Sequence, residues 1–252
     1  MSEMPQLNLD FDEFCLFVDV DGTLIDLASR PEHVHATEDI LATLDSLYFA
    51  LGGALAVVSG RRIEDIDRIF SPLRLPASGI HGAQIRRSPD SPIFEGPVPD
   101  IPAAVASAAA DVAARHPGAF IENKGKALAV HWRAIPDQDR ELWAGLTAAV
   151  ERVDPSLTLM RGHCVFEIKS PTTTKGDAVR TFMKAEPFAN RTPVFIGDDI
   201  TDIAGMAAVK TMGGCAYSVG QRLEGADAVF ASPAAVRSWL GGLVGALEAG
   251  RA

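Results

Sequence analysis

The sequence has little of what marks exported, membrane-spanning or zinc-binding proteins. Only 3 of its 252 residues are cysteines, and they are widely spaced without a Cys-x-x-Cys pair, which argues against a disulfide framework or a zinc knuckle. No run approaches the roughly 18 apolar residues of a membrane-spanning helix. The acidic first residues lack the basic and apolar regions of a signal peptide. We therefore expect a cytoplasmic protein with reduced thiols and no membrane partner.

Positive charge is also scarce. The chain has 23 Lys and Arg against 33 Asp and Glu, which gives a formal net charge of −10. Proteins hold the phosphates of nucleic acids through surplus positive charge, so we expect no nucleic-acid partner. With 47% hydrophobic and 22% charged residues, the composition is that of a globular protein, and the length suits one large or two modest domains.

Three apolar runs, each ended by polar or glycine residues, are typical of strands buried on both faces of a parallel sheet. Helical patterns lie between them, and this alternation predicts an α/β fold with a doubly wound sheet. In such sheets the ligand site forms at the carboxyl ends of the strands. The predicted strands are Phe14–Val20, Ala54–Val58 and Pro193–Gly197, and the predicted helices are Glu38–Ala50, Ile63–Phe70 and Lys175–Lys184.

The spacing of these elements predicts an inserted domain. Arg61 and Lys175 are 114 residues apart, whereas roughly 30 residues connect neighbouring parallel strands through one helix. The interval contains two helical patterns, two short strand patterns and a pair of strands that we expect to form a hairpin at Gly162-His163. We predict a small α+β cap at residues 83–169, inserted into a core formed by residues 1–82 and 170–252.

Asp19 and Asp21 follow the first predicted strand and precede Gly22. Two carboxylates at this spacing can converge on one point, where a hard divalent cation such as Mg²⁺ would relieve their repulsion. Asp19 could then attack phosphorus while Asp21 gives a proton to the leaving alcohol. The alternative is an Asp-Gly turn whose carboxylates merely cap the backbone.

Three acids, Asp198, Asp199 and Asp202, follow the third predicted strand and could supply further ligands for a cation facing Asp19. Alternatively, they only begin a helix, whose N-terminus favours acidic residues.

Two further segments could bind phosphate. Ser59-Gly60-Arg61 offers a hydroxyl, backbone N–H groups and a guanidinium, although it also fits an ordinary strand-to-helix turn. Lys175, at the start of a predicted helix, could place an ammonium beside the transferred phosphoryl group, or it could lie on the surface.

The order DVDGTL, SGR, Lys175 and GDDITD resembles the haloacid dehalogenase superfamily of phosphotransferases. The resemblance implies a Rossmann-like core with a cap of the C2 type. It makes Asp19 the nucleophile and Asp21 the general acid and base. Ser59, Gly60, Arg61 and Lys175 would hold the phosphate. By the same resemblance, the ligands of Mg²⁺ would be Asp19, Asp21 and Asp198, supported by Thr23, Asp199 and Asp202.

Further motifs resemble the bacterial trehalose-6-phosphate phosphatases, from about Phe14 to Leu240; they include Gly79-Ile80-His81-Gly82, Glu122-Asn123-Lys124-Gly125 and the segment Gly162–Lys169. This resemblance implies hydrolysis of trehalose 6-phosphate through an aspartyl-phosphate at Asp19. By the same resemblance, Glu122, Lys124 and Glu167 would grip the sugar hydroxyls from the cap. Residues i and i+2 of a strand share a face, so Glu122 and Lys124 would present a polar pair in one direction. We expect a monomer.

Several points stay open at this level. The substrate could be another sugar phosphate, such as sucrose 6-phosphate or mannosyl-phosphoglycerate, or the chain could be a catalytically weak sensor of a sugar phosphate. The polar pairs of the cap could be solvated ion pairs. Ile203 stands where relatives usually have a glutamate, a loss that could weaken support of the metal. His81 could be a hinge or support the site, and the roles of His131 and Arg133 are undefined.

Overall fold

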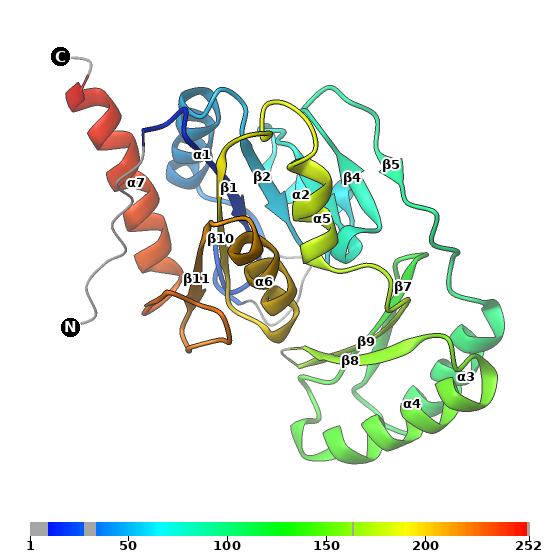
Figure 1. Ribbon diagram of the computed structural model, residues 1–252. Coiled ribbons are helices and arrows are strands. Elements are labelled where there is room, and N and C mark those ends of the chain that lie inside the picture. Colours follow the sequence, from blue (N-terminus) through cyan, green and yellow to red (C-terminus); the bar gives the residue numbers. More distant parts are fainter. Residues whose placement is uncertain (1–9, 28–33, 163, 251–252) are drawn as a thin grey trace. The chain divides into compact units, whose positions relative to one another are not determined.

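The structure, a computed structural model, describes residues 10–27, 34–162 and 164–250 (Figure 1). Its described residues form two compact units. The core unit comprises the described residues up to Gly96 and those from Thr174 onward, and the inserted unit is Pro97–Thr173. In the described part of the chain, no helix combines the length and the apolar character needed to cross a membrane.

The core unit contains an eight-stranded sheet in the order β12-β11-β10-β1-β2-β3-β4-β5. From β1 the chain adds β2 and β3 in one direction, and from β10 it adds β11 and β12 in the other. The strand order therefore reverses between β1 and β10, and this switch point is where open α/β sheets bind ligands. The parallel strands are β1 (Phe14–Val18), β2 (Leu55–Val58), β3 (Ala77–Gly79), β10 (Thr192–Gly197), β11 (Cys215–Val219) and β12 (Ala228–Phe230).

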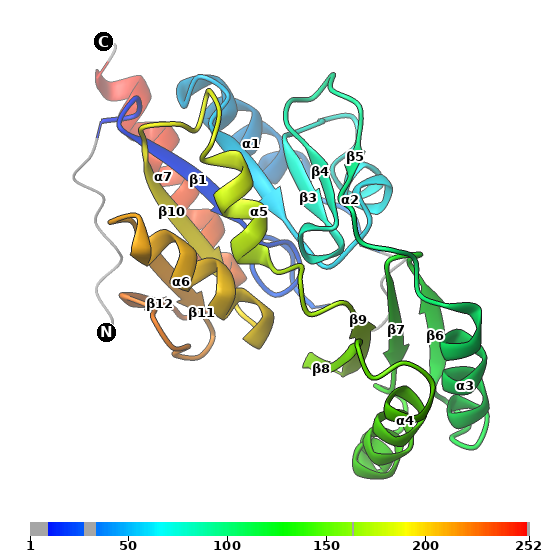
Figure 2. The same ribbon diagram turned by 45° about the vertical axis from the view of Figure 1, so that its right-hand side comes forward.

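Helices cover both faces of this sheet, which confirms the doubly wound α/β fold. Figures 1 and 2 show α5 and α6 on one face and α1 and α7 on the other. Every residue of β1 and β2 is buried, as expected for strands between two helical layers. The core helices are α1 (Glu38–Ala50), α2 (Ile63–Phe70), α5 (Lys175–Phe182), α6 (Ile203–Thr211) and α7 (Pro233–Gly250).

The core unit extends further along the chain than the boundary predicted at residue 83. Strand β4 (Gln84–Arg86) pairs antiparallel with β3, and β5 (Phe94–Glu95) pairs antiparallel with β4. The guanidinium of the fully buried Arg86 donates two hydrogen bonds of 2.6 Å to Asp67 of α2. This half-buried ion pair ties β4 to the core unit, whose first segment ends at Gly96. The second boundary falls before Thr174, and the prediction placed it before residue 170.

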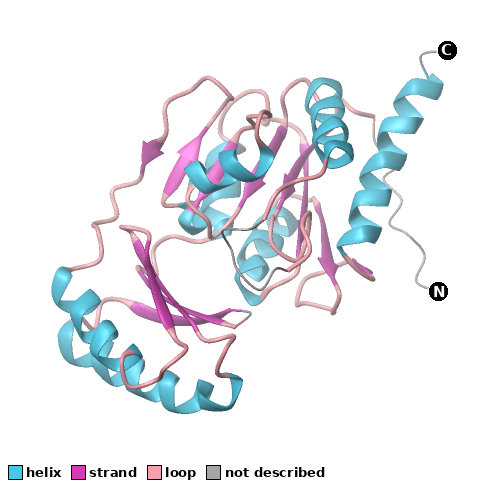
Figure 3. Cartoon of the chain, turned by 180° about the vertical axis from the view of Figure 1, so that it is seen from behind, coloured by secondary structure: helices cyan, strands magenta, loops and turns pink. Residues whose placement is uncertain are grey.

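The described residues of the inserted unit contain an antiparallel sheet in the order β6-β7-β9-β8, two α-helices and a short 3-10 helix at Pro136–Gln138; the sheet and the α-helices are visible in Figure 3. One face of the sheet presents apolar side chains, among them Leu128, Val130 and Phe166, to a core shared with the helices. The predicted hairpin is present as β8 and β9, but His163 of its turn lies outside the described residues. The elements are α3 (Ala103–Ala113), β6 (Phe120–Asn123), β7 (Ala127–His131), α4 (Asp139–Val153), β8 (Thr158–Gly162) and β9 (Val165–Lys169).

Candidate active site

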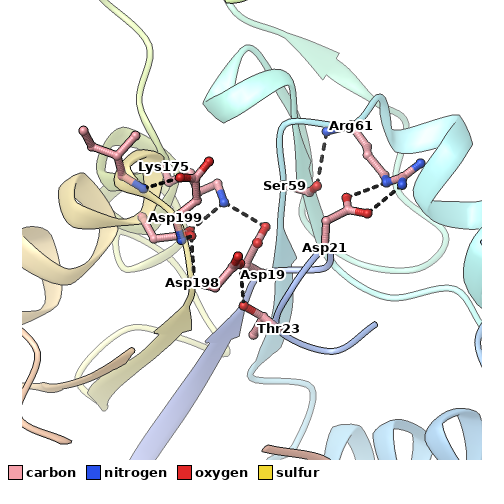
Figure 4. Close-up of polar contacts among 10 residues, drawn as sticks. Asp19, Asp21, Thr23, Ser59, Arg61, Lys175, Asp198 and Asp199 are labelled. Atoms are coloured by element: carbon pink, nitrogen blue, oxygen red, sulfur yellow. Dashed lines mark hydrogen bonds and ion pairs between the residues drawn. The ribbon is translucent and has the colours of Figure 1, made fainter. Parts of the chain in front are cut away.

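Three carboxylates meet at the switch point of the core sheet. Asp19 directly follows β1, and Asp198 and Asp202 follow β10. Each offers an oxygen atom such that the three atoms lie within 4.8 Å of one another. Figure 4 shows Asp19 and Asp198 facing each other at the ends of their strands. Residues almost 180 positions apart are thus brought together because β1 and β10 are adjacent and parallel.

Lys175 supplies a positive charge to this cluster. Its ammonium lies 2.7 Å from Asp19 Oδ1 and 2.6 Å from Asp202 Oδ1, and the residue is only 2% exposed. Lys175 is the first residue of α5, whose start is held by a capping box between Thr174 and Asp177. The sequence-based alternative of a surface lysine is therefore wrong.

The cluster contains one ammonium and three carboxylates, so its carboxylates repel one another. Together with burial, this repulsion raises the pKa values of Asp19 and Asp198. Burial raises the pKa of Asp19 well above its usual value; Lys175 opposes that shift, and the charges of Asp202 and Asp198 add to it. Burial together with the charge of Asp202 raises the pKa of Asp198 to about 7. Burial alone would lower the pKa of Lys175, but its attraction to Asp19 and Asp202 outweighs burial and raises it. Lys175 therefore stays charged, while the carboxyls of Asp19 and Asp198 hold protons to higher pH.

This cluster has the properties of a site for a divalent cation. Its donors are carboxylate oxygens, which hard cations prefer. The raised pKa values of Asp19 and Asp198 report repulsion and desolvation that a bound cation would relieve. Close packing also fixes Asp198: Thr23 Oγ1 donates to its Oδ1 at 3.1 Å, and a Cβ added at Gly22 would lie 2.2 Å from its Oδ2.

Asp199 and Asp202 were both predicted to support the metal ligands, but their side chains lie in different surroundings. Asp202 is fully buried inside the cluster, where its Oδ2 accepts hydrogen bonds from the backbone N–H groups of Asp198 and Asp199. Asp199 instead caps the short helix Ile200–Asp202 through the N–H of Ile200. Ile203, which stands where relatives usually have a glutamate, is the first residue of α6. The three-carboxylate cluster forms without a carboxylate at that position.

The side chain of Asp21, the third predicted metal ligand, lies apart from the three carboxylates, and its role as a metal ligand stays a prediction. Its carboxylate lies outside the group of three, and both of its oxygens accept hydrogen bonds of 2.6 Å from Arg61 (Figure 4). Because Arg61 presents a planar fork, this bidentate pair is geometrically specific. The Arg61 backbone N–H also donates to Ser59 Oγ at 3.2 Å. The end of β2 and the loop after β1 are therefore joined at the predicted phosphate-binding segment.

The sheet of the inserted unit has a polar face opposite its apolar one. There Lys124 donates to Glu167 Oε1 at 3.0 Å, and both side chains are 8% exposed. Glu122 Oε2 lies 2.9 Å from His131 Nε2. The register places Ala129 of β7 between Glu122 and Glu167. The three residues predicted to bind sugar hydroxyls thus share one face, whereas Arg133 is exposed in the turn after β7.

His131 is a partner of Glu122 that sequence reasoning left undefined. Its ring stacks on Phe120 with centroids 4.4 Å apart, which holds the imidazole against the carboxylate. Burial alone would raise the pKa of Glu122, but the hydrogen bond from His131 and the charge of Lys124 outweigh it and lower that pKa. The alternation of residues along β6 and β7 indicates that Glu122 and His131 each lie on one face of a sheet. It does not predict that they are neighbours, because the register between the two strands is not encoded in that alternation.

Two of the solved structures that resemble this chain show its fold. The C-terminal domain of C. albicans trehalose-6-phosphate phosphatase superposes with a TM-score of 0.85 at 18% identity, covering 97% of this chain and 99% of that one. A phosphatase of the haloalkanoate (HAD) enzyme superfamily from Bacteroides thetaiotaomicron superposes with a TM-score of 0.59 at 16% identity, covering 98% of each chain. The fold is therefore that of the HAD phosphatases.

Sequence comparison then identifies the family. The model of the trehalose-phosphatase family matches residues 17–229. A probable trehalose-phosphate phosphatase of Sinorhizobium fredii is 39% identical over 97% of this chain and 91% of its own length. Trehalose-6-phosphate phosphatase of Escherichia coli is 36% identical over 98% of this chain and 92% of its own. The chain belongs to the trehalose-phosphatase family, a family of phosphoric monoester hydrolases.

Proposed function

We propose that the chain hydrolyses trehalose 6-phosphate to trehalose and inorganic phosphate with Mg²⁺ as its cofactor. The observation that carries the chemistry is the position of Asp19 at the switch point, in contact with Lys175 and beside Asp198 and Asp202. The substrate is supported by the names of the full-length relatives in S. fredii and E. coli.

In the first step, a carboxylate oxygen of Asp19 attacks phosphorus in line, and the bond from phosphorus to the sugar oxygen breaks. Asp21 gives that oxygen a proton, so trehalose leaves as an alcohol and an aspartyl-phosphate remains. In the second step, Asp21 takes a proton from water, whose oxygen attacks phosphorus and releases inorganic phosphate and Asp19. For Asp21 to carry the proton, Arg61 must exchange its carboxylate partner for phosphate oxygens.

The other polar groups bind and neutralise the phosphoryl group. Ser59, Gly60 and Arg61 offer a hydroxyl, backbone N–H groups and a guanidinium at the end of β2, and Lys175 offers an ammonium beside Asp19. Asp19, Asp21 and Asp198 would hold Mg²⁺, with Asp202 adjacent to Asp19 and Asp198. When bound, the cation neutralises charge on the phosphoryl oxygens and on the carboxylates.

Removal of the cation tests the metal requirement and the substrate together. We expect phosphate release from trehalose 6-phosphate to fall to background in EDTA and to return when Mg²⁺ is restored in excess. A panel that includes sucrose 6-phosphate and mannosyl-phosphoglycerate should show the highest kcat/KM for trehalose 6-phosphate. Full turnover in EDTA would contradict the metal requirement. No turnover of any of these substrates with Mg²⁺ would favour a sugar-phosphate sensor.

Glu122→Gln tests the polar face of the inserted unit. The amide keeps the size of the side chain but removes the charged acceptor, and hydrogen bonds to charged groups contribute about 1.5–3 kcal/mol. We therefore expect kcat/KM for trehalose 6-phosphate to fall roughly 10- to 100-fold, with little change for p-nitrophenyl phosphate, which has no sugar. Glu151→Gln, on an exposed position of α4, is the matched control. Equal losses on both substrates would exclude a role for Glu122 in sugar recognition.

A further inference from the structure

The buried turn between β3 and β4 has an unusual backbone. Ile80, His81 and Gly82 are consecutive residues with φ angles of 48°, 52° and 102°. Left-handed backbone is unfavourable for residues with a side chain, and it is rarest for β-branched residues such as isoleucine. Ile80 and His81 are nevertheless 2% and 5% exposed. Strain of this kind persists only where the surrounding contacts impose it, so those contacts indicate what the turn does.

On one side the turn contacts the segment Ser59–Arg61. The His81 N–H donates to the Ser59 carbonyl at 3.0 Å, and the Ile80 N–H donates to the Arg61 carbonyl at 2.8 Å. The imidazole itself lies against Gly60, because a Cβ added at Gly60 would be 2.6 Å from His81 Nε2 and 2.7 Å from Cε1. The turn therefore contacts the backbone of all three residues: it donates hydrogen bonds to the carbonyls of Ser59 and Arg61, and its imidazole packs against Gly60.

On its other side the turn abuts the start of α5. A Cβ added at Gly82 would lie 2.7 Å from the carbonyl oxygen of Thr174, the residue that caps α5 and precedes Lys175. A glycine with positive φ is therefore required at this close approach. The same turn thus touches both the segment 59–61 and Thr174, which are far apart in sequence.

From this geometry we propose that His81 is a positioning residue for the segment Ser59–Arg61. Its imidazole packs against Gly60, and its left-handed turn sets the distance between that segment and the start of α5. The inference rests on the proposed function, because it takes Ser59–Arg61 to bind the phosphoryl group. His81 acts through the backbone of that segment and is not assigned a contact with the substrate.

His81→Asn removes the ring while keeping a residue that tolerates left-handed backbone and retains the N–H. Loss of a group that orients ligand-binding residues typically costs about 10- to 100-fold, so we expect Kd for inorganic phosphate, measured by calorimetry with Mg²⁺ present, to rise at least tenfold. KM should rise with it while kcat changes less, because the segment binds the phosphoryl group in the ground state and in the transition state. His116→Asn, a buried histidine of the inserted unit that bonds Gln138, should leave phosphate binding unchanged.

A pair of variants tests the contact even where His81→Asn fails to fold. Gly60→Ala places a methyl group against the imidazole and should weaken phosphate binding. His81→Gly removes the ring, so adding Gly60→Ala to it should cause little further loss. Parent-like phosphate binding in a folded His81→Asn would overturn the proposal, as would independent losses in the double variant. Because inorganic phosphate is the probe, a failure of trehalose 6-phosphate as substrate would leave this test intact.

Discussion

Asp19→Asn should abolish turnover of trehalose 6-phosphate and of p-nitrophenyl phosphate alike, with a loss of at least about 10⁴-fold in kcat. The amide has nearly the size of the carboxylate, but it is a poor nucleophile and cannot form the aspartyl-phosphate. Acid quenching during turnover should trap phosphorylated protein in the parent and none in the variant. Phosphate release and the trapped phosphoenzyme are measured on the same samples.

The fold of the Asp19→Asn variant should survive, which separates chemistry from stability. Removing one of three neighbouring carboxylates lowers their repulsion, and Lys175 keeps its contact with Asp202 at 2.6 Å. We expect the free energy of unfolding at pH 8 to stay within about 1 kcal/mol of the parent or to rise. Asp45→Asn, an exposed position of α1, is the control for the substitution itself. Comparable turnover in the parent and Asp19→Asn would refute the nucleophile assignment.

The fold was predictable where the sequence carries strong local patterns. The helices Glu38–Ala50 and Ile63–Phe70 have the predicted bounds, because their apolar residues recur at helical spacing. The extension of the core sheet by β4 and β5 was missed, because strands of three and two residues show no readable alternation. Nor does a charged residue such as Arg86 resemble a core residue until its partner Asp67 is known.

The candidate site was predictable as a set of residues but not as a set of contacts. The carboxyl ends of parallel strands lie at the same edge of a sheet, and this rule was enough to predict that Asp19 and Asp198 lie close together. It does not say which way a side chain turns: Asp21 faces Arg61, and Asp202 points into the cluster. These orientations follow from side-chain packing and long-range pairing, which residue types and spacing along one chain do not encode.

Lys175→Met is expected to remove both activity and stability. The ammonium is the positive group that contacts Asp19 and Asp202, so its loss leaves buried carboxylates uncompensated. Removing one partner of a buried ion pair costs about 3–5 kcal/mol, and we expect a deficit of that size in urea unfolding at pH 8 in EDTA. The kcat should fall at least about 10³-fold, because phosphoryl transfer depends on positive charge at the transferred group. Lys210→Met, which breaks an exposed pair with Asp227, should cost less than about 1 kcal/mol.

The pH dependence of the Lys175→Met deficit distinguishes lost charge compensation from lost packing. Without the ammonium, which holds the pKa of Asp19 down, that pKa in the folded state should lie still further above its unfolded value, so the folded protein binds more protons than the unfolded chain. Stability is then lost as pH rises from the unfolded pKa toward the folded pKa. The deficit relative to the parent should therefore be smaller at pH 5 than at pH 8. Mg²⁺ should reduce the deficit at pH 8, because a cation held by the same carboxylates replaces the missing charge. A deficit that is equal at both pH values and insensitive to Mg²⁺ would mean that Lys175 contributes only packing, and the electrostatic account of the cluster would then be wrong.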